Sequence, residues 1–366
     1  MRKTFASNFI MAAIVISMLT AVSRSEAGQI EITDMSGRTV NVPANPERIV
    51  CLGPGSLRQI VYLGQQHKVV GIENFEKNSP YGRPYLLANP QLVQLPTIAM
   101  GGPGNINNEP DLEATLKVRP EVIFISYMDP GKATTLQDKL GIPVVVLTQG
   151  RFAGFDEKLF DSLNVAARIL GAEERAASII QFINDARMDL NQRVGDTLAK
   201  PGPSVYVGGV GFRGQQGIES TDYDYTPFEW VKANNVVKSL NKKERLFINK
   251  EQLLAWNPDI IFIDGSGLVP TLQDYQKNPG YYESLKAFRE SRIYVLFPFN
   301  FYVTNIDTSI ADAYAVGKLL YPESFADIDI TSNANRIYKF FVNKPVYEFM
   351  EKDFGALTGN GGFTKK

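Results

Sequence analysis

The chain has 366 residues, of which 38 are basic and 39 acidic, so its net charge is close to neutral at −1. This balance gives no electrostatic basis for binding nucleic acid or an anionic membrane surface. One cysteine and one histidine exclude an internal disulfide and supply too few thiolate and imidazole ligands for a bare zinc or manganese site.

The beginning of the chain has the layout of a secretory signal peptide. Two basic residues precede an apolar run from Phe9 to Val22, and a short polar stretch ends at Ala27. This run of about 14 residues is shorter than the roughly 20 that cross a bilayer, and no later segment is apolar enough. We predict that residues 1–27 are a signal peptide and that the mature protein is periplasmic, monomeric and not inserted in the membrane. Cys51 lies in an apolar run and is expected to be buried.

Beyond the signal peptide, short apolar runs alternate with helical segments. This alternation is typical of α/β architecture with mainly parallel sheets. The predicted strands are 49–52, 69–72, 122–125 and 144–147 in the first half, and 205–207, 260–263 and 293–296 in the second.

The most regular helical pattern lies between the two halves. Apolar residues recur at spacings of three and four from Leu159 to Leu170 and again from Ile179 to Val194. We predict a helix over 154–197, in which Gly171 can introduce a bend, because Gly195 and then Pro201-Gly202-Pro203 end the pattern. This helix would join an N-terminal lobe, 28–153, to a C-terminal lobe, 198–366.

The two halves repeat each other weakly. LEATLKVRPE at 112–121 and KEQLLAWNPD at 250–259 each lead into a predicted strand. Each has a glutamate, Glu113 or Glu251, seven residues before a proline, and an acidic residue after that proline. Two equivalent lobes that end their strands toward each other would form a cleft for a small-molecule ligand.

The residue inventory argues against an enzyme. His67 lies in a polar stretch where a solvated loop is expected, and no G-x-S-x-G motif is present. Gly209–Gly214 matches G-x-G-x-x-G, but the helix that a dinucleotide site needs is not predicted after it. We expect a glycine-rich loop at a cleft rim, with Arg213 at its tip, and no bound cofactor.

Polar and aromatic residues just past the predicted strands are candidates for ligand binding, since an α/β sheet presents its ligands there. Arginines can bind carboxylate, phosphate or oxyanion groups through two hydrogen bonds, and tyrosines combine a flat apolar ring with a polar tip. The candidates are Ser56, Arg58, Tyr127, Arg213, Tyr225, Asn300 and Tyr302.

Nearly all of the mature chain resembles the periplasmic iron-siderophore and vitamin B12 type substrate-binding proteins of ABC importers. The segments that carry the resemblance are ITDMSGRTV at 32–40 with Pro43 and Pro46, RIV at 48–50, LG at 63–64, VVG at 69–71 and both E-x6-P segments. It implies a class III α/β fold, with two Rossmann-like lobes joined by a long rigid helix and a ligand cleft between them. It also implies that Glu113 and Glu251 dock against arginines of a permease dimer.

The resemblance defines the transporter class better than the ligand. Arg58 departs from a family pattern that often has glutamate there, and this favours a more cationic pocket. An anionic metal chelate, with a ferric siderophore as first candidate, fits such a pocket. Molybdate or tungstate is the alternative within the class, and cobalamin and heme are less favoured. From other classes, a periplasmic enzyme or a structural protein would be distinguished by turnover or by the lack of a saturable ligand.

Overall fold

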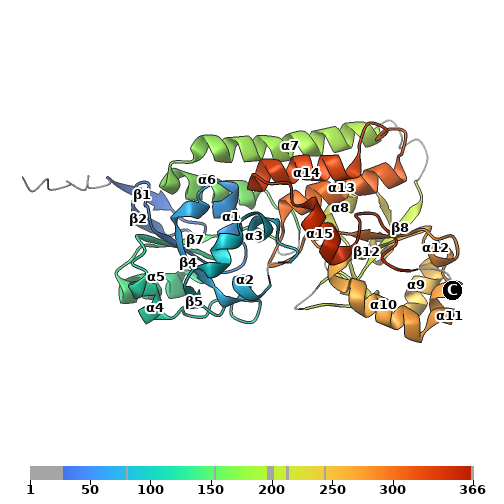
Figure 1. Ribbon diagram of the computed structural model, residues 1–366, viewed down its shortest axis with the longest axis horizontal. Coiled ribbons are helices and arrows are strands. Elements are labelled where there is room, and N and C mark those ends of the chain that lie inside the picture. The colour runs from blue at the N-terminus through green and yellow to red at the C-terminus, as the bar shows by residue number, and fades with distance from the viewer. Residues whose placement is uncertain are drawn as a thin grey trace, which may run out of the picture.

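The computed structural model describes residues 28–79, 81–151, 154–195, 202–211, 214–242 and 245–363. Two α/β lobes lie side by side, and helix α7 (Glu173–Gly195) runs along both of them (Figure 1). The predicted signal peptide and Arg213 lie outside the described residues.

The N-terminal lobe is built on a five-stranded parallel sheet in the order β5-β4-β3-β6-β7. Three neighbouring strands of this sheet are fully buried and rich in β-branched residues, as expected for a sheet covered on both faces. The strands are β3 (Ile49–Leu52), β4 (Val69–Glu73), β5 (Thr97–Ala99), β6 (Val122–Ser126) and β7 (Val144–Leu147), preceded by an antiparallel hairpin of β1 (Gln29–Thr33) and β2 (Thr39–Pro43). The helices are α1 (Ser56–Tyr62), α2 (Asn74–Asn78), α3 (Pro84–Ala88), α4 (Leu112–Lys117), α5 (Pro130–Leu140) and α6 (Lys158–Leu170).

The C-terminal lobe contains a four-stranded parallel sheet in the order β10-β8-β12-β13 and a small antiparallel pair, β11-β9. The strands are β8 (Ser204–Gly208), β9 (Ser220–Asp222), β10 (Asn234–Asn235), β11 (Arg245–Phe247), β12 (Ile260–Asp264) and β13 (Ile293–Leu296). The helices are α8 (Thr226–Trp230), α9 (Lys250–Trp256), α10 (Leu268–Lys277), α11 (Pro279–Ser284), α12 (Lys286–Arg289), α13 (Ile306–Leu320), α14 (Ile330–Val342) and α15 (Tyr347–Phe354). All seven predicted strands are confirmed in the two lobes.

The predicted helix over 154–197 is divided into two helices, α6 and α7. Gly171 has a φ of 65° and ends α6 in the left-handed conformation, which glycine adopts without a steric penalty. Helix α6 packs on α1, β1 and β7 in the N-terminal lobe, whereas α7 packs on α6 at one end and on α8 and α13 of the C-terminal lobe. The segment that joins the lobes is therefore α7.

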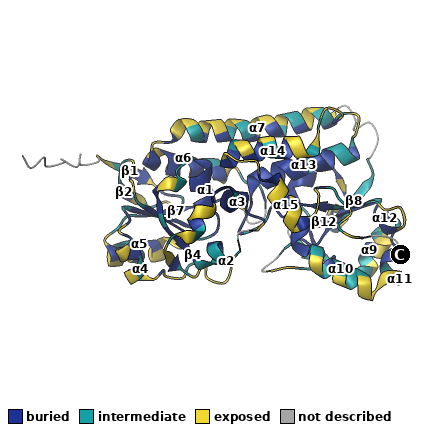
Figure 2. Ribbon diagram, viewed as in Figure 1, coloured by how far each residue is buried: buried dark blue, intermediate teal, exposed yellow. Residues whose placement is uncertain are grey.

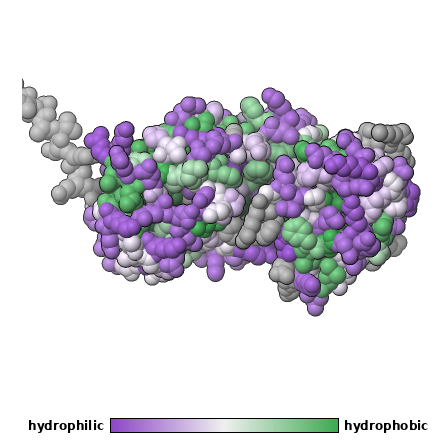
Figure 3. All heavy atoms as spheres, turned by 90° about the horizontal axis from the view of Figure 1, so that it is seen from below, coloured by the Kyte–Doolittle hydropathy of each residue, from purple (hydrophilic) through white to green (hydrophobic). Residues whose placement is uncertain are grey.

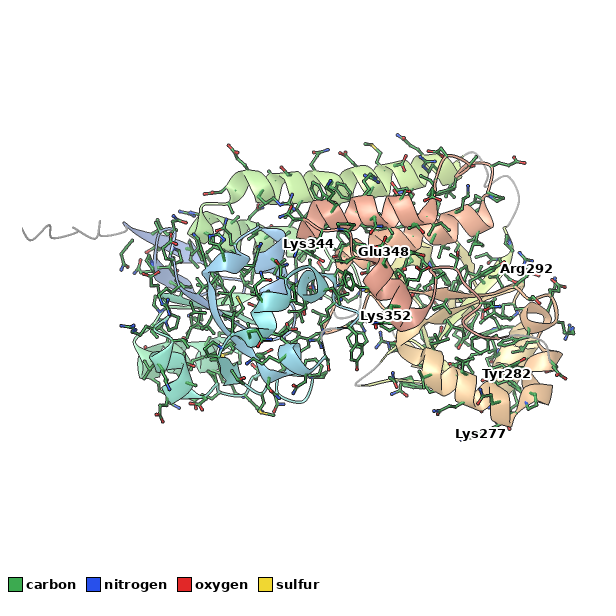
Figure 4. The ribbon with its side chains drawn as sticks, in the orientation of Figure 1. Lys277, Tyr282, Arg292, Lys344, Glu348 and Lys352 are labelled. Carbon is green, nitrogen blue, oxygen red and sulfur yellow. The ribbon has the colours of Figure 1, made fainter. Side chains whose placement is uncertain are left out.

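The lobes share a helical layer. Helix α13 is buried along most of its length, and α14 packs on α1 and α3 of the N-terminal lobe (Figure 2). Phe182 of α7 stacks on Phe340 of α14 with ring centroids 4.1 Å apart. Lys344, labelled in Figure 4, lies just after α14 and donates a hydrogen bond to the Ala88 carbonyl of α3 at 2.5 Å. This shared apolar packing opposes large rigid-body motion of one lobe against the other.

None of the helices in the described part of the chain is long and apolar enough to cross a membrane. Viewed from below in Figure 3, hydrophilic side chains cover most of both lobes and hydrophobic ones gather in smaller patches.

Candidate ligand-binding site between the lobes

The two lobes meet at a loop that follows β13. Residues 297–305 leave the carboxyl end of β13 and carry Tyr302 to the carboxyl ends of the N-terminal strands. Asn300 and Thr304 form an antiparallel bridge across the loop, and Asn305 Nδ2 donates hydrogen bonds to the carbonyls of Phe299 and Phe301, each at 3.1 Å. We call this junction the seam.

The tip of the loop has an unusual backbone. Tyr302 and Val303 have φ values of 56° and 58°, in the left-handed region that side chains rarely adopt. This conformation is costly for a β-branched residue such as Val303, on the order of 1–3 kcal/mol, and is kept only where the surroundings impose it. The strain points to a functional requirement for the position of Tyr302 and its neighbour.

Arg58 of α1 holds this loop tip. Its side chain is fully buried; Nη1 donates to the Val303 carbonyl at 3.2 Å, and Nη2 donates to the Tyr302 carbonyl at 3.1 Å and to Gln149 Oε1 at 3.2 Å. All three acceptors are neutral. Arg58 also interacts electrostatically with the buried carboxyl of Asp307, and its positive charge opposes the rise that burial causes in the pKa of that group. A ligand anion at the hydrogen-bonding end of the guanidinium would be a second counter-charge.

A second set of contacts joins the lobes through the Tyr302 hydroxyl. It donates a hydrogen bond to Glu73 Oε2 at 2.6 Å and accepts one from the Gly102 N–H at 2.9 Å, while Glu73 Oε1 accepts from the Gly53 N–H at 2.8 Å. Burial raises the pKa of Glu73 to about 7, although the hydrogen bonds from Tyr302 and Gly53 oppose this shift. Sequence reasoning missed Glu73; the available signal was an acidic residue at the end of the buried strand β4.

A cavity of about 280 Å³ lies beside Glu73, at the carboxyl ends of β3, β4 and β6. Tyr302 lines it from the C-terminal lobe. The cavity is thus placed where parallel sheets present their ligands, as the sequence predicted for the cleft as a whole.

The structure brings some of the predicted ligand-binding residues together. Arg58 and Tyr302 are in direct contact, and Tyr127 is linked to them because its hydroxyl accepts a hydrogen bond from the Gln149 N–H at 3.3 Å. Asn300, in the same loop as Tyr302, donates to the Gly211 carbonyl at 3.5 Å.

Two other predicted residues are buried within their own lobes. Ser56 Oγ donates to the Phe124 carbonyl of β6 at 3.2 Å. Tyr225 donates to Asp264 Oδ2 at 3.3 Å, and its ring packs on Phe299 at 5.2 Å between centroids. Both side chains support the elements around the seam in this arrangement.

The predicted docking glutamates occupy equivalent helices in the two lobes. Glu113 in α4 and Glu251 in α9 are both exposed in the first helical turn. Each helix begins with a side-chain cap, in which Asp111 accepts from the Ala114 N–H at 2.9 Å and Asn249 from the Gln252 N–H at 2.8 Å. The weak sequence repeat therefore corresponds to a repeated local structure.

Other sequence predictions can be compared with the structure. Cys51 is buried, which raises the pKa of its thiol, and His67 is exposed. Among the described residues around the glycine-rich segment, β8 leads through Gly209 to β9 without an intervening helix. No cluster of three or more His, Cys, Asp or Glu side chains that could hold a metal ion occurs in the described ranges.

Buried carboxyls should make the protein more stable in mild acid than at alkaline pH. Burial raises the pKa of Glu73 to about 7 and of Asp264 and Asp307 to about 6, whereas unfolded carboxyls titrate near pH 4. Between these values the native state binds more protons than the unfolded chain, so stability falls as the pH rises. We expect urea denaturation to show a free energy of unfolding that is larger at pH 5 than at pH 8 by about 3–5 kcal/mol.

The control for this pH dependence is Glu73→Gln, which should remove the part of the decrease that falls between pH 6 and 8. Groups with lowered pKa values, such as Asp259 at about 2, titrate below this range. A stability that rises from pH 5 to 8 would contradict the assignment.

Comparison with known proteins places this geometry in a family. A sequence profile described as periplasmic binding protein matches residues 49–298. The chain belongs to this family. This periplasmic binding protein is 23% identical over 352 residues to the molybdate-binding protein MolA of Haemophilus influenzae. The match covers 90% of this chain and 95% of MolA. Over 201 residues it is 26% identical to an iron-uptake system-binding protein of Bacillus subtilis, covering 51% of this chain and 58% of that protein.

Solved structures of periplasmic binding proteins share the fold. A periplasmic solute binding protein from Veillonella parvula superposes with a TM-score of 0.71 at 19% identity, covering 89% of this chain and 97% of that one. MolA of Haemophilus influenzae, bound to molybdate, superposes with a TM-score of 0.65 at 20% identity, covering 86% and 98%. These neighbours show the predicted class III architecture of two α/β lobes, and the family implies a periplasmic location.

Proposed function

We propose that this periplasmic binding protein is the monomeric solute-binding component of an ABC importer and that residues 1–27 are its export signal. Its ligand is a metal-containing anion, which binds at the seam and is released chemically unchanged. The observation that carries the anionic ligand is Arg58, a buried guanidinium whose acceptors are two backbone carbonyls and an amide. Oxygen atoms of a ligand would replace the Tyr302 and Val303 carbonyls at this group when the seam opens.

The neighbourhood of Arg58 offers a further donor. Gln149 Nε2 is buried without a hydrogen-bond partner among the described residues. The absence of a side chain at Gly55 lets these two donors lie close together, since a Cβ there would lie 1.7 Å from Gln149 Nε2 and 2.6 Å from Arg58 Nη2. An oxyanion or the carboxylate of a chelate could therefore accept hydrogen bonds from both side chains.

Two ligand classes fit this arrangement. An anionic metal chelate, such as a ferric siderophore or ferric citrate, is supported by the resemblance to iron-uptake binding proteins, including the Fe(3+)-citrate-binding protein YfmC of Bacillus subtilis, to which this chain is 27% identical over 191 residues. Molybdate or tungstate is supported by the similarity to MolA, which extends over 95% of that protein. The two classes differ in size and in hydrogen-bond donors.

Calorimetric titration with molybdate, tungstate, sulfate and ferric citrate tests the proposal. We expect at least one metal-containing anion to bind with a Kd below about 1 μM, and Gln149→Leu to weaken it about tenfold. Gln59→Leu is the matched control, because Gln59 is also a buried amide but bonds to Thr148 and Ser162 within the N-terminal lobe. Equal effects of the two substitutions, or tight binding of sulfate, would contradict the assignment.

Docking to the permease is proposed for the equivalent helices α4 and α9. Glu113 and Glu251 are exposed there, and each is followed three residues later by an exposed leucine, Leu116 at 48% and Leu254 at 37%. Residues three apart share one helix face, so each lobe presents a carboxylate beside an apolar side chain. Both helices lie on the side of the lobes away from α7 (Figure 1), which fits a partner that contacts the two lobes at once.

A further inference from the structure

The cavity on the hydroxyl side of Tyr302 has acidic residues in its lining, whereas the carbonyl side of Tyr302 contacts the cationic Arg58. Of the described residues that line the cavity, the charged ones are all acidic: Glu73, Glu109 and Asp111. Glu109 is exposed and paired with Lys139 at 2.8 Å, and Asp111 caps α4. Glu73 is the buried member of the set, and its carboxylate accepts hydrogen bonds from groups on two sides.

A second polar group in the cavity is available to a ligand. Ser126, at the end of β6, is 2% exposed, and its hydroxyl has no hydrogen-bond partner among the described residues. The rest of the lining is mixed, with apolar residues from the strands and polar residues from β5 and the loop after it: Leu52, Ile98, Ile125, Thr97, Asn105, Asn107 and Asn108. The cavity therefore combines apolar side chains with a buried carboxylate and an unused hydroxyl, and the carboxylate would repel an oxyanion.

We propose that this cavity binds an alkylammonium group of the ligand, with its methylene groups on the apolar side chains and its N–H groups donating to Glu73 and Ser126. The proposal rests on the proposed function and defines the ligand further as a metal chelate with an amine-bearing arm. Tyr302 separates the two parts of such a ligand, since its carbonyl faces Arg58 and its hydroxyl faces Glu73. The anionic chelate would lie on the Arg58 side and the cationic arm on the Glu73 side.

Other charged groups around Glu73 do not remove its preference for a cation. Glu76 in α2 and Arg83 before α3 form a buried ion pair at 2.6 Å, so their effects on Glu73 largely offset each other. The remaining neighbours in the cavity, Glu109 and Asp111, are acidic. Because burial raises the pKa of Glu73 to about 7, an ammonium ion should bind more tightly at pH 8 than at pH 6.

A direct test uses n-butylammonium as the probe and butyrate as its matched anion, in NMR titrations of the full mature protein. We expect saturable shifts at the amides of Gly53, Ile98 and Ser126 with butylammonium, and binding about tenfold weaker or absent with butyrate. Glu73→Gln and Ser126→Ala should each weaken the binding of butylammonium several-fold, whereas Glu109→Gln should not. The same spectra show whether each variant is folded.

Equal binding of butyrate, or butylammonium binding that is unchanged in both Glu73→Gln and Ser126→Ala, would overturn the ammonium site. So would the lack of saturable binding by butylammonium at either pH. If a metal-containing anion still binds and depends on Gln149, the proposed function survives and only the ammonium site is lost. If no metal-containing anion binds at all, it is the proposed function that fails.

Discussion

Substitution of both Glu113 and Glu251 by lysine should abolish stimulation of the permease ATPase and leave ligand affinity unchanged. The two carboxylates are exposed on equivalent helices, and their placement allows one partner to contact both lobes. Charge pairs across an interface contribute about 1.5–7 kcal/mol each, so two reversals should weaken docking by at least about a hundredfold.

The measurement is ATP hydrolysis by the cognate transporter in lipid nanodiscs, with ligand affinity of the free protein measured in parallel. The double variant Glu174→Lys with Glu348→Lys is the control, because these glutamates are also exposed but lie on α7 and α15. Glu348 is labelled in Figure 4. Stimulation that survives the Glu113 and Glu251 reversals, or is lost equally in the control, would remove the two residues from the docking surface. Leu116→Ala with Leu254→Ala should cause a smaller loss of the same kind.

Arg58→Met should destabilise the protein by about 3 kcal/mol and reduce ligand affinity at least tenfold. The substitution leaves the carbonyls of Tyr302 and Val303 and the Gln149 side chain without their buried donor, while methionine fills part of the volume. The loop tip then loses the contact that holds its left-handed backbone in place.

The matched control is Arg48→Met. Arg48 also donates to backbone carbonyls, of Val118 at 2.6 Å and Arg119 at 3.2 Å, but its contacts are partly open to water, so its loss should cost less than about 1 kcal/mol. Urea denaturation gives both values. Equal destabilisation by the two substitutions would show that the seam contributes no more than a surface contact.

The sequence could predict the elements that have a local signal. The strands 49–52, 122–125 and 260–263 are continuous apolar runs, and their burial follows from composition. The short edge strands β5 and β10 lack such a run, because three and two residues carry too little pattern. The sequence predicts a bend at Gly171, but the left-handed conformation of this glycine ends α6 there, so the segment forms two separate helices.

The seam depends on contacts that no local pattern reveals. Tyr302 was predicted as a candidate, but its partner Glu73 is 229 positions away in the sequence. Arg58 was predicted to face the ligand, and two of its three acceptors proved to be carbonyls more than 240 residues distant. Which side chains meet at a strand end is set by how the two lobes pack, whereas the matching positions of Glu113 and Glu251 could be predicted because their repeat is local.

Native mass spectrometry of the protein purified from the periplasm of its own host, coupled to elemental analysis, tests the central claim most directly. We expect one ligand per chain, released intact on unfolding, with an added mass of several hundred daltons that includes iron and an amine. A small increment that contains molybdenum or tungsten would keep the importer and exclude the amine-bearing chelate. A chain saturated with a metal-free solute would contradict the proposal that this protein carries a metal-containing anion.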